Sequence, residues 1–172
     1  TGVGLPYAVT VSIFGGTAES IALWFKSIGH ENWFYFYLTA VIAAGLLLLT
    51  LAVLHGPLPP TADVTLVALF AAALIVSECL PMRLLYASEG EITMSPTFAL
   101  ALLVVGGASA AMCAMAIGSI CSDVFLRRAP WRLGFNVGQY EISVAAGAGV
   151  LALLSGTSFW APHQLVPSLL PA

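Results

Sequence analysis

Charged side chains are scarce in this chain of 172 residues. Only 8% of the residues are Asp, Glu, Lys or Arg, whereas 60% are hydrophobic. A soluble globular protein has about 25% charged residues. Most of the chain therefore cannot face water, and the composition predicts an all-α integral membrane bundle in contact with the lipid bilayer.

Basic residues and ligand motifs are also few. Five Lys or Arg residues are not enough for a nucleic-acid-binding surface. The three cysteines lie in or beside apolar stretches without a C-x-x-C pair, which argues against a zinc site and against a disulfide scaffold. No haem, flavin or nucleotide motif is present, and the three histidines are separated. We expect no cofactor, no metal and no enzymatic activity. The cysteines are Cys79, Cys113 and Cys121, and the histidines are His30, His55 and His163.

A secretory signal is missing from the start of the sequence. The first residue is Thr1, and no basic n-region or small-residue cleavage site follows it. We expect the chain to be a piece of a longer protein.

Six hydrophobic segments follow one another along the chain. A membrane-spanning helix needs about 20 apolar residues, and the fourth segment covers only ~14 Å as a helix. We expect this short segment to be re-entrant, with "VGGAS" separating it from the fifth. The segments are Leu5–Phe25, Trp33–Leu54, Val64–Leu80, Thr97–Val105, Ser109–Phe125 and Gly134–Leu154.

Proline marks a boundary between two halves. "HGPLPPTAD" contains three prolines and a glycine, which is typical of a linker. We therefore divide the chain into residues 1–56, a linker at 57–62 and a second unit at 63–172. The proline-bounded stretch "PMRLLYASEGEITMSP" is expected to be a loop.

Three of the basic residues share one short loop and indicate the orientation. Arg127, Arg128 and Arg132 place this loop in the cytoplasm by the positive-inside rule, which predicts a multi-pass protein of the inner membrane. We expect the fourth and fifth segments to make one crossing together, so that the loop from Arg83 to Glu91 lies outside. Lys26 then also lies outside, and a fully spanning fourth segment would invert these positions.

Glu19 is a carboxylate within the first apolar segment. Insertion into hydrocarbon penalises such a group by ~2.5–3.5 kcal/mol, so it is a candidate functional residue. Gly15 and Gly16 precede it and allow a bend or a close helix contact. A carboxylate preceded by two glycines is typical of a helix that lines a solute path and moves during transport. The alternative is a hydrated, structural Glu19 near the outer interface.

The first 47 residues carry the pattern "LPYA…SIFGGTAE…ALWFK". This stretch resembles the last two transmembrane helices of major facilitator superfamily transporters, in the branch of the metabolite:proton symporters that includes 2-oxoglutarate and other organic-acid permeases. The resemblance implies an organic acid and a proton as partners of the complete transporter. It also implies that the first segment runs from inside to outside. Tyr7, Gly15, Gly16 and Glu19 then match an eleventh helix that packs beside the central cavity.

The resemblance ends after Leu54, where such transporters normally finish with a short charged tail. Here the chain continues into more membrane segments. Two transporter helices cannot form an alternating-access path, because that path needs two helical bundles around a midplane site. We therefore expect no transport by this chain alone.

Polar residues of the second half fall into small groups. Glu78 and Arg83 are close enough in sequence to pair, and Asp123 and Arg127 have the i, i+4 spacing of a helical ion pair.

A polar stripe runs along the sixth segment, through Asn136, Gln139, Tyr140 and Ser143. It serves either as hydrogen-bonding contact between helices or as part of a ligand pocket. Glu141 lies off this stripe, and the sequence does not identify its partner.

Short motifs between Asp63 and Ser155 resemble a second family. "GEITxSxTFAxAL", "SDxxxRRxPW" and "FNxxQY" are similar to the membrane domain upstream of GGDEF-type and HD-GYP-type bacterial signalling modules. This resemblance implies a sensory or anchoring domain, with Glu78, Arg83, Asn136, Gln139 and Tyr140 as its polar cluster. No catalytic motif of the output modules occurs.

Three hypotheses remain open for the chain. It is a truncated or fused transporter element, a membrane sensor domain without its output domain, or a structural membrane protein that packs with partner helices. The junction of the two resemblances, near residues 55–62, is a genuine fusion, a remnant of a deletion or a joining of sequence fragments.

Overall fold

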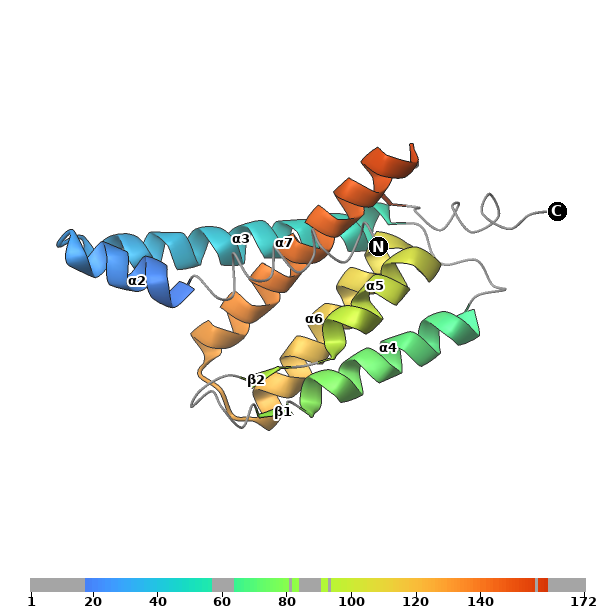
Figure 1. Ribbon diagram of the computed structural model, residues 1–172, viewed down its shortest axis with the longest axis horizontal. Coiled ribbons are helices and arrows are strands. Elements are labelled where there is room, and N and C mark those ends of the chain that lie inside the picture. The colour runs from blue at the N-terminus through green and yellow to red at the C-terminus, as the bar shows by residue number, and fades with distance from the viewer. Residues whose placement is uncertain are drawn as a thin grey trace.

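The computed structural model describes residues 18–56, 64–80, 82–83, 91–92, 94–156 and 158–160. These residues form an all-α membrane bundle, as expected (Figure 1). Two short strands, β1 and β2, pair antiparallel within the expected loop. The elements are α2 (Ala18–Ser27), α3 (Glu31–His55), α4 (Val64–Cys79), β1 (Met82–Arg83), β2 (Glu91–Ile92), α5 (Ser95–Val105), α6 (Gly107–Phe125) and α7 (Pro130–Ser155).

Three of the described helices are long and apolar enough to cross a membrane. They are Glu31–His55, Gly107–Phe125 and, within α7, Pro130–Leu154. The apolar helices α4 and α5 are shorter, with 16 and 11 residues. At 1.5 Å per residue they reach ~24 and ~16 Å, less than the ~30 Å hydrocarbon core. The chain is thus a multi-pass membrane protein, and the third segment is short as well as the fourth.

Glycine contacts show that α4 and α6 run in the same direction. A β-carbon on Gly106, just before α6, would lie 3.1 Å from Val67 near the start of α4. A β-carbon on Gly118, farther along α6, would lie 2.9 Å from Leu74 in the second half of α4. The chain segments that follow these two helices therefore leave the bundle at the same end.

Helix α5 connects these two parallel helices in the chain, packs against both and runs antiparallel to them (Figure 1). Its reversal into α6 occurs at Gly106 and Gly107, and Gly107 has a φ of 83°, which glycine adopts without strain. The prediction that the fourth and fifth segments make one crossing is therefore wrong. The β1–β2 pair and the arginine loop lie at one end of the bundle, not at opposite ends.

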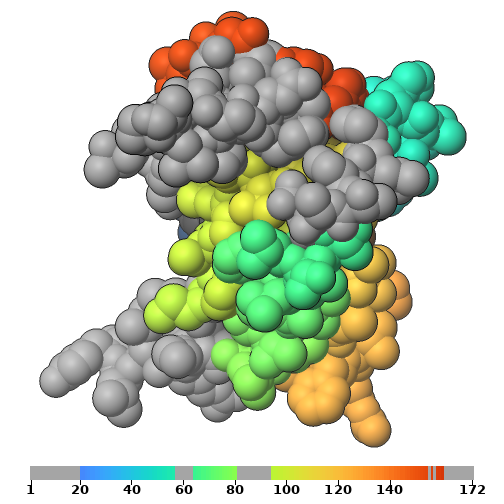
Figure 2. All heavy atoms as spheres, turned by 90° about the vertical axis from the view of Figure 1, so that its right-hand side faces the viewer, coloured from blue at the N-terminus to red at the C-terminus, as the bar shows by residue number. Residues whose placement is uncertain are grey.

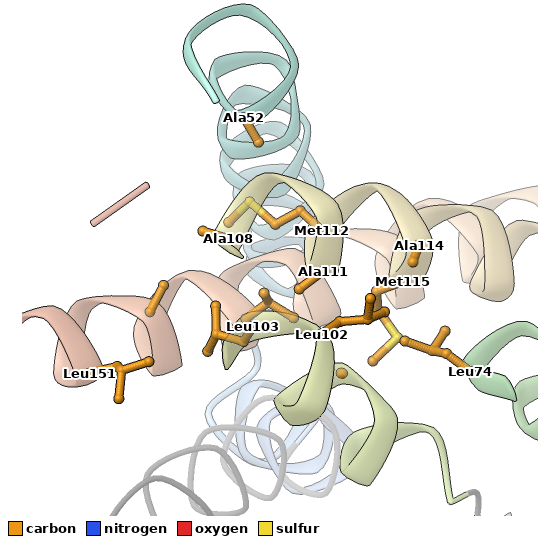
Figure 3. Close-up of a cluster of buried hydrophobic side chains, with 13 residues drawn as sticks. Ala52, Leu74, Leu102, Leu103, Ala108, Ala111, Met112, Ala114, Met115 and Leu151 are labelled. Atoms are coloured by element: carbon orange, nitrogen blue, oxygen red, sulfur yellow. The ribbon is translucent and has the colours of Figure 1, made fainter. Parts of the chain in front are cut away.

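A single large hydrophobic cluster joins α3, α4, α5, α6 and α7. Figure 3 shows Met115 of α6 beside Leu74 of α4, with Leu102 of α5 close to both. In the end-on view of Figure 2, α4 lies against the α5–α6 pair. Ala52 of α3 belongs to the same cluster. The described helices on both sides of the proline linker consequently share one core.

Candidate functional site

A polar cluster lies where α6 turns into α7. The carboxylate of Asp123 is only 2% exposed and accepts hydrogen bonds from Asn136 Nδ2, at 3.2 Å to Oδ1 and 3.0 Å to Oδ2. Arg128 NH1 lies 3.3 Å from Asp123 Oδ1 and forms an ion pair with it. The cluster therefore ties the last turn of α6 to both the loop and the first half of α7.

The local backbone explains why Arg128, and not Arg127, pairs with Asp123. Helix α6 ends at Phe125, and Arg127 adopts a left-handed φ of 51°. The backbone N–H of Arg128 donates to the carbonyl of Asp123 at 2.9 Å, which brings the arginine back over the helix end. The i, i+4 ion pair predicted for Asp123 and Arg127 is wrong because the helix does not extend that far.

The predicted polar stripe of α7 divides into different environments. Asn136 bonds to α6, as the interhelical interpretation requires. Ser143 is fully buried, and its hydroxyl donates to the Gln139 carbonyl of its own helix at 2.8 Å. Gln139 is 9% exposed, and its Oε1 has no hydrogen-bond partner among the described residues. Tyr140 is half-buried against the large core cluster.

Glu141 is the residue of α7 that sequence reasoning left without a role. Its side chain is 0% exposed, and neither carboxylate oxygen has a hydrogen-bond partner in the described part of the chain. It follows the buried Val137 by four residues and precedes the buried Val144 by three. This apolar i, i+4, i+7 spacing is the sequence signal that would have indicated its burial.

Glu78 lies near the end of α4 and is also buried, at 5% exposure. Its Oε2 atom has no hydrogen-bond partner among the described residues. The backbone of Arg83 belongs to β1 and pairs in register with Glu91, but the Arg83 side chain lies outside the described residues. The predicted pairing of Glu78 with Arg83 thus stays a prediction.

The loop between α6 and α7 carries most of the basic residues, and the β1–β2 pair lies at the same end of the bundle (Figure 1). Arg127 and Arg132 are exposed, and the Arg132 guanidinium stands 5.1 Å from the centre of the Trp131 ring. Lys26 lies in the last turn of α2, next to the α2–α3 turn, and this turn and the start of α7 both lie toward the left of Figure 1. The basic end is formed by Lys26, Arg83, Arg127, Arg128 and Arg132.

The residues matched to the transporter family lie mostly before the described part. Tyr7, Gly15 and Gly16 are outside the described residues. Glu19 belongs to α2, but its side chain is likewise not described. Their proposed roles therefore stay predictions. In the described ranges, no three His, Cys, Asp or Glu side chains group to hold a metal ion.

One known protein matches part of this sequence. The alpha-ketoglutarate permease of Escherichia coli (strain K12) is 59% identical over 44 residues, which make up 24% of this chain and 10% of the permease. The chain contains a transporter-like membrane segment. No protein-family model and no solved structure matches it. The matched protein is a permease and not an enzyme, in agreement with the sequence-based expectation.

Proposed function

We propose that this chain contains the C-terminal part of a major facilitator superfamily symporter, which in its complete form takes up an organic acid together with protons across the inner membrane. The identity to the permease carries this proposal. The motif "SIFGGTAE" supports it, because it puts an acid three residues after a pair of glycines in an apolar segment. In this proposal Tyr7, Gly15, Gly16 and Glu19 line the solute and proton path.

This chain alone does not supply the helices that would enclose such a path. Alternating access needs two helical bundles that move around a central site. The described helices instead pack into one bundle with one large shared core. We therefore expect liposomes that contain only this chain to show no uptake of 2-oxoglutarate above empty liposomes.

A chimera tests the proposed role of the first segment. Residues 1–47 of this chain replace the matching segment of the permease, and uptake of radiolabelled 2-oxoglutarate into cells is measured. We expect the chimera to transport, because the two segments are closely similar. We expect Glu19→Gln in the chimera to abolish proton-coupled uptake, because the amide cannot release a proton.

Glu31→Gln is the matched control, since Glu31 is an exposed carboxylate at the start of α3. This variant should transport like the unmodified chimera. An expressed, membrane-inserted chimera without transport would contradict the assignment of the segment. Unchanged, proton-driven uptake by the Glu19→Gln chimera would contradict only the coupling role.

The second unit has its own candidate function as a sensory or anchoring membrane domain. The short motifs between Asp63 and Ser155 support it. Helices α4, α5, α6 and α7 pack into one core cluster together with Ala52 of α3, and this packing suits a membrane anchor. A signalling module encoded after residue 172 in the same reading frame would support this candidate. Its complete absence there would favour a purely structural role.

A further inference from the structure

The centre of α7 holds an acid that the transport proposal does not use. Glu141 lies near the middle of the apolar stretch Pro130–Leu154, and its side chain is fully buried. Both carboxylate oxygens lack a hydrogen-bond partner among the described residues. An ionised carboxylate in such a place has neither water nor protein donors to solvate it, so its charged form is strongly disfavoured.

Positive charge is also distant from Glu141. On its own helix the nearest basic residue is Arg132, about 13 Å away along the helix axis at 1.5 Å per residue. Arg128 is engaged at the α6–α7 turn with Asp123. Lys26 belongs to the last turn of α2, Arg83 to β1, and Arg127 to the loop that precedes α7. Nothing in the described bundle therefore neutralises a carboxylate at this depth.

The helices that pack against α7 bring few titratable groups to Glu141. From α6 comes the partly buried thiol of Cys113, which lies near Glu141. Helix α5 carries no titratable side chain. From α3, Tyr37 packs on Phe135, with 6.1 Å between ring centres. Tyr140 is the neighbouring titratable group on α7, and Asp123 near the end of α6 is already bonded to Asn136 and Arg128.

We propose that Glu141 is a proton-binding site in the interior of the membrane bundle. One proton adds to a carboxylate oxygen, and the side chain changes from a charge of minus one to a neutral acid. The neutral form is compatible with the closed packing of α7, whereas the anion requires water or a donor and so requires the helices to rearrange. The packing of α7 is therefore sensitive to pH. This proposal does not depend on the transport proposal.

A bound metal cation would be a different occupant of the same acid. Cations such as Ca²⁺ need six to eight oxygen ligands at short distance. The described residues offer no cluster of three His, Cys, Asp or Glu side chains. The chemistry at Glu141 therefore favours a proton over a metal ion.

Infrared spectroscopy of the full chain in lipid nanodiscs tests the proposal. A protonated carboxylic acid has a carbonyl band that a carboxylate lacks. We expect this band in the unmodified chain at about pH 7, where exposed Asp and Glu side chains are ionised. The isosteric Glu141→Gln variant should lose the part of this band that Glu141 contributes, and Glu31→Gln, at an exposed position, should keep the whole band. Absence of the band in the unmodified chain would overturn the proposal.

A second measurement needs no variant. Dicyclohexylcarbodiimide is an apolar reagent that modifies protonated carboxyls within membranes, and mass spectrometry maps the modified residue. We expect Glu141 to be modified roughly tenfold or more over Glu31, because an exposed Glu is almost fully ionised near pH 7. Equal modification of both residues would contradict the proposal. Protection of Glu141 by sodium but not by potassium would show a cation site and overturn the assignment of a proton.

Discussion

Gly45 of α3 and Gly138 of α7 face each other where these two helices cross. A β-carbon on Gly45 would overlap the Gly138 α-carbon, and one on Gly138 would stand 2.7 Å from the Val41 carbonyl oxygen. Small residues allow membrane helices to approach with their backbones in contact. Because α3 precedes the proline linker and α7 follows it, this contact joins the two halves of the chain.

Substitution of Gly45 by alanine should separate α3 from α7. The new methyl group meets backbone atoms, which cannot move away as a flexible side chain can. Overpacking of this kind costs ~1–3 kcal/mol, and we expect the upper part of that range here. Thermal unfolding of the purified chain in detergent measures the loss.

Gly149→Ala is the matched control for this prediction. Gly149 lies in the same helix as Gly138, but the nearest atom to its β-carbon position is Phe159 Cε2, at an ordinary 3.9 Å. The control should unfold at the same temperature as the unmodified chain or slightly above it, since alanine favours the helix. Equal stability of Gly45→Ala would show that the two helices do not cross at these glycines.

The polar cluster at the α6–α7 turn gives a second prediction. Arg128→Gln should destabilise the chain by ~1–3 kcal/mol, because it removes the ionic partner of the buried Asp123 carboxylate. The exposed part of Arg128 favours the lower half of this range, since solvent screens the pair. Thermal unfolding at low and high salt provides the measurement.

Arg127→Gln is its control, one residue earlier in the same loop. Arg127 is exposed and lies outside the ion pair, so its loss should leave the unfolding temperature unchanged. If both variants were equally destabilised, net charge in the loop, and not the specific pair with Asp123, would account for the effect.

Hydropathy and spacing were sufficient to locate the helices. The segment predicted at Trp33–Leu54 is the helix Glu31–His55, and that predicted at Ser109–Phe125 is Gly107–Phe125. Charged residues and glycines bound these apolar runs, so their ends are visible in the sequence. The β1–β2 pair was not predicted, because two residues per strand carry no periodicity.

The burial of Glu141 and the direction of α5 needed the structure. A polar stripe identifies one face of a helix, but α7 is covered by helices on several sides, so a residue off the stripe is buried too. The glycines at 106 and 107 predicted a break without showing its geometry. Only the positive φ of Gly107 turns this break into a reversal.

The direction of α5 changes the expected membrane topology and gives the third prediction. The single-cysteine variants Ser27→Cys, Ser88→Cys and Ala129→Cys, in a background without the three native cysteines, add a thiol near Lys26, between β1 and β2, and beside Arg128. We expect all three to react with a membrane-impermeant thiol reagent from the same side. By the positive-inside rule this side is the cytoplasm.

Ser158→Cys is the control, because Ser158 is exposed beyond the opposite end of α7 and should react only from outside. Labelling of Ser88→Cys and Ala129→Cys from opposite sides would contradict the parallel arrangement of α4 and α6. The Ser27→Cys result has a further consequence. With a cytoplasmic basic end α3 runs outward, whereas the transporter resemblance has the first segment run outward and the second return. A cytoplasmic Ser27→Cys would therefore mean that this helix pair is inserted opposite to its orientation in the transporter family.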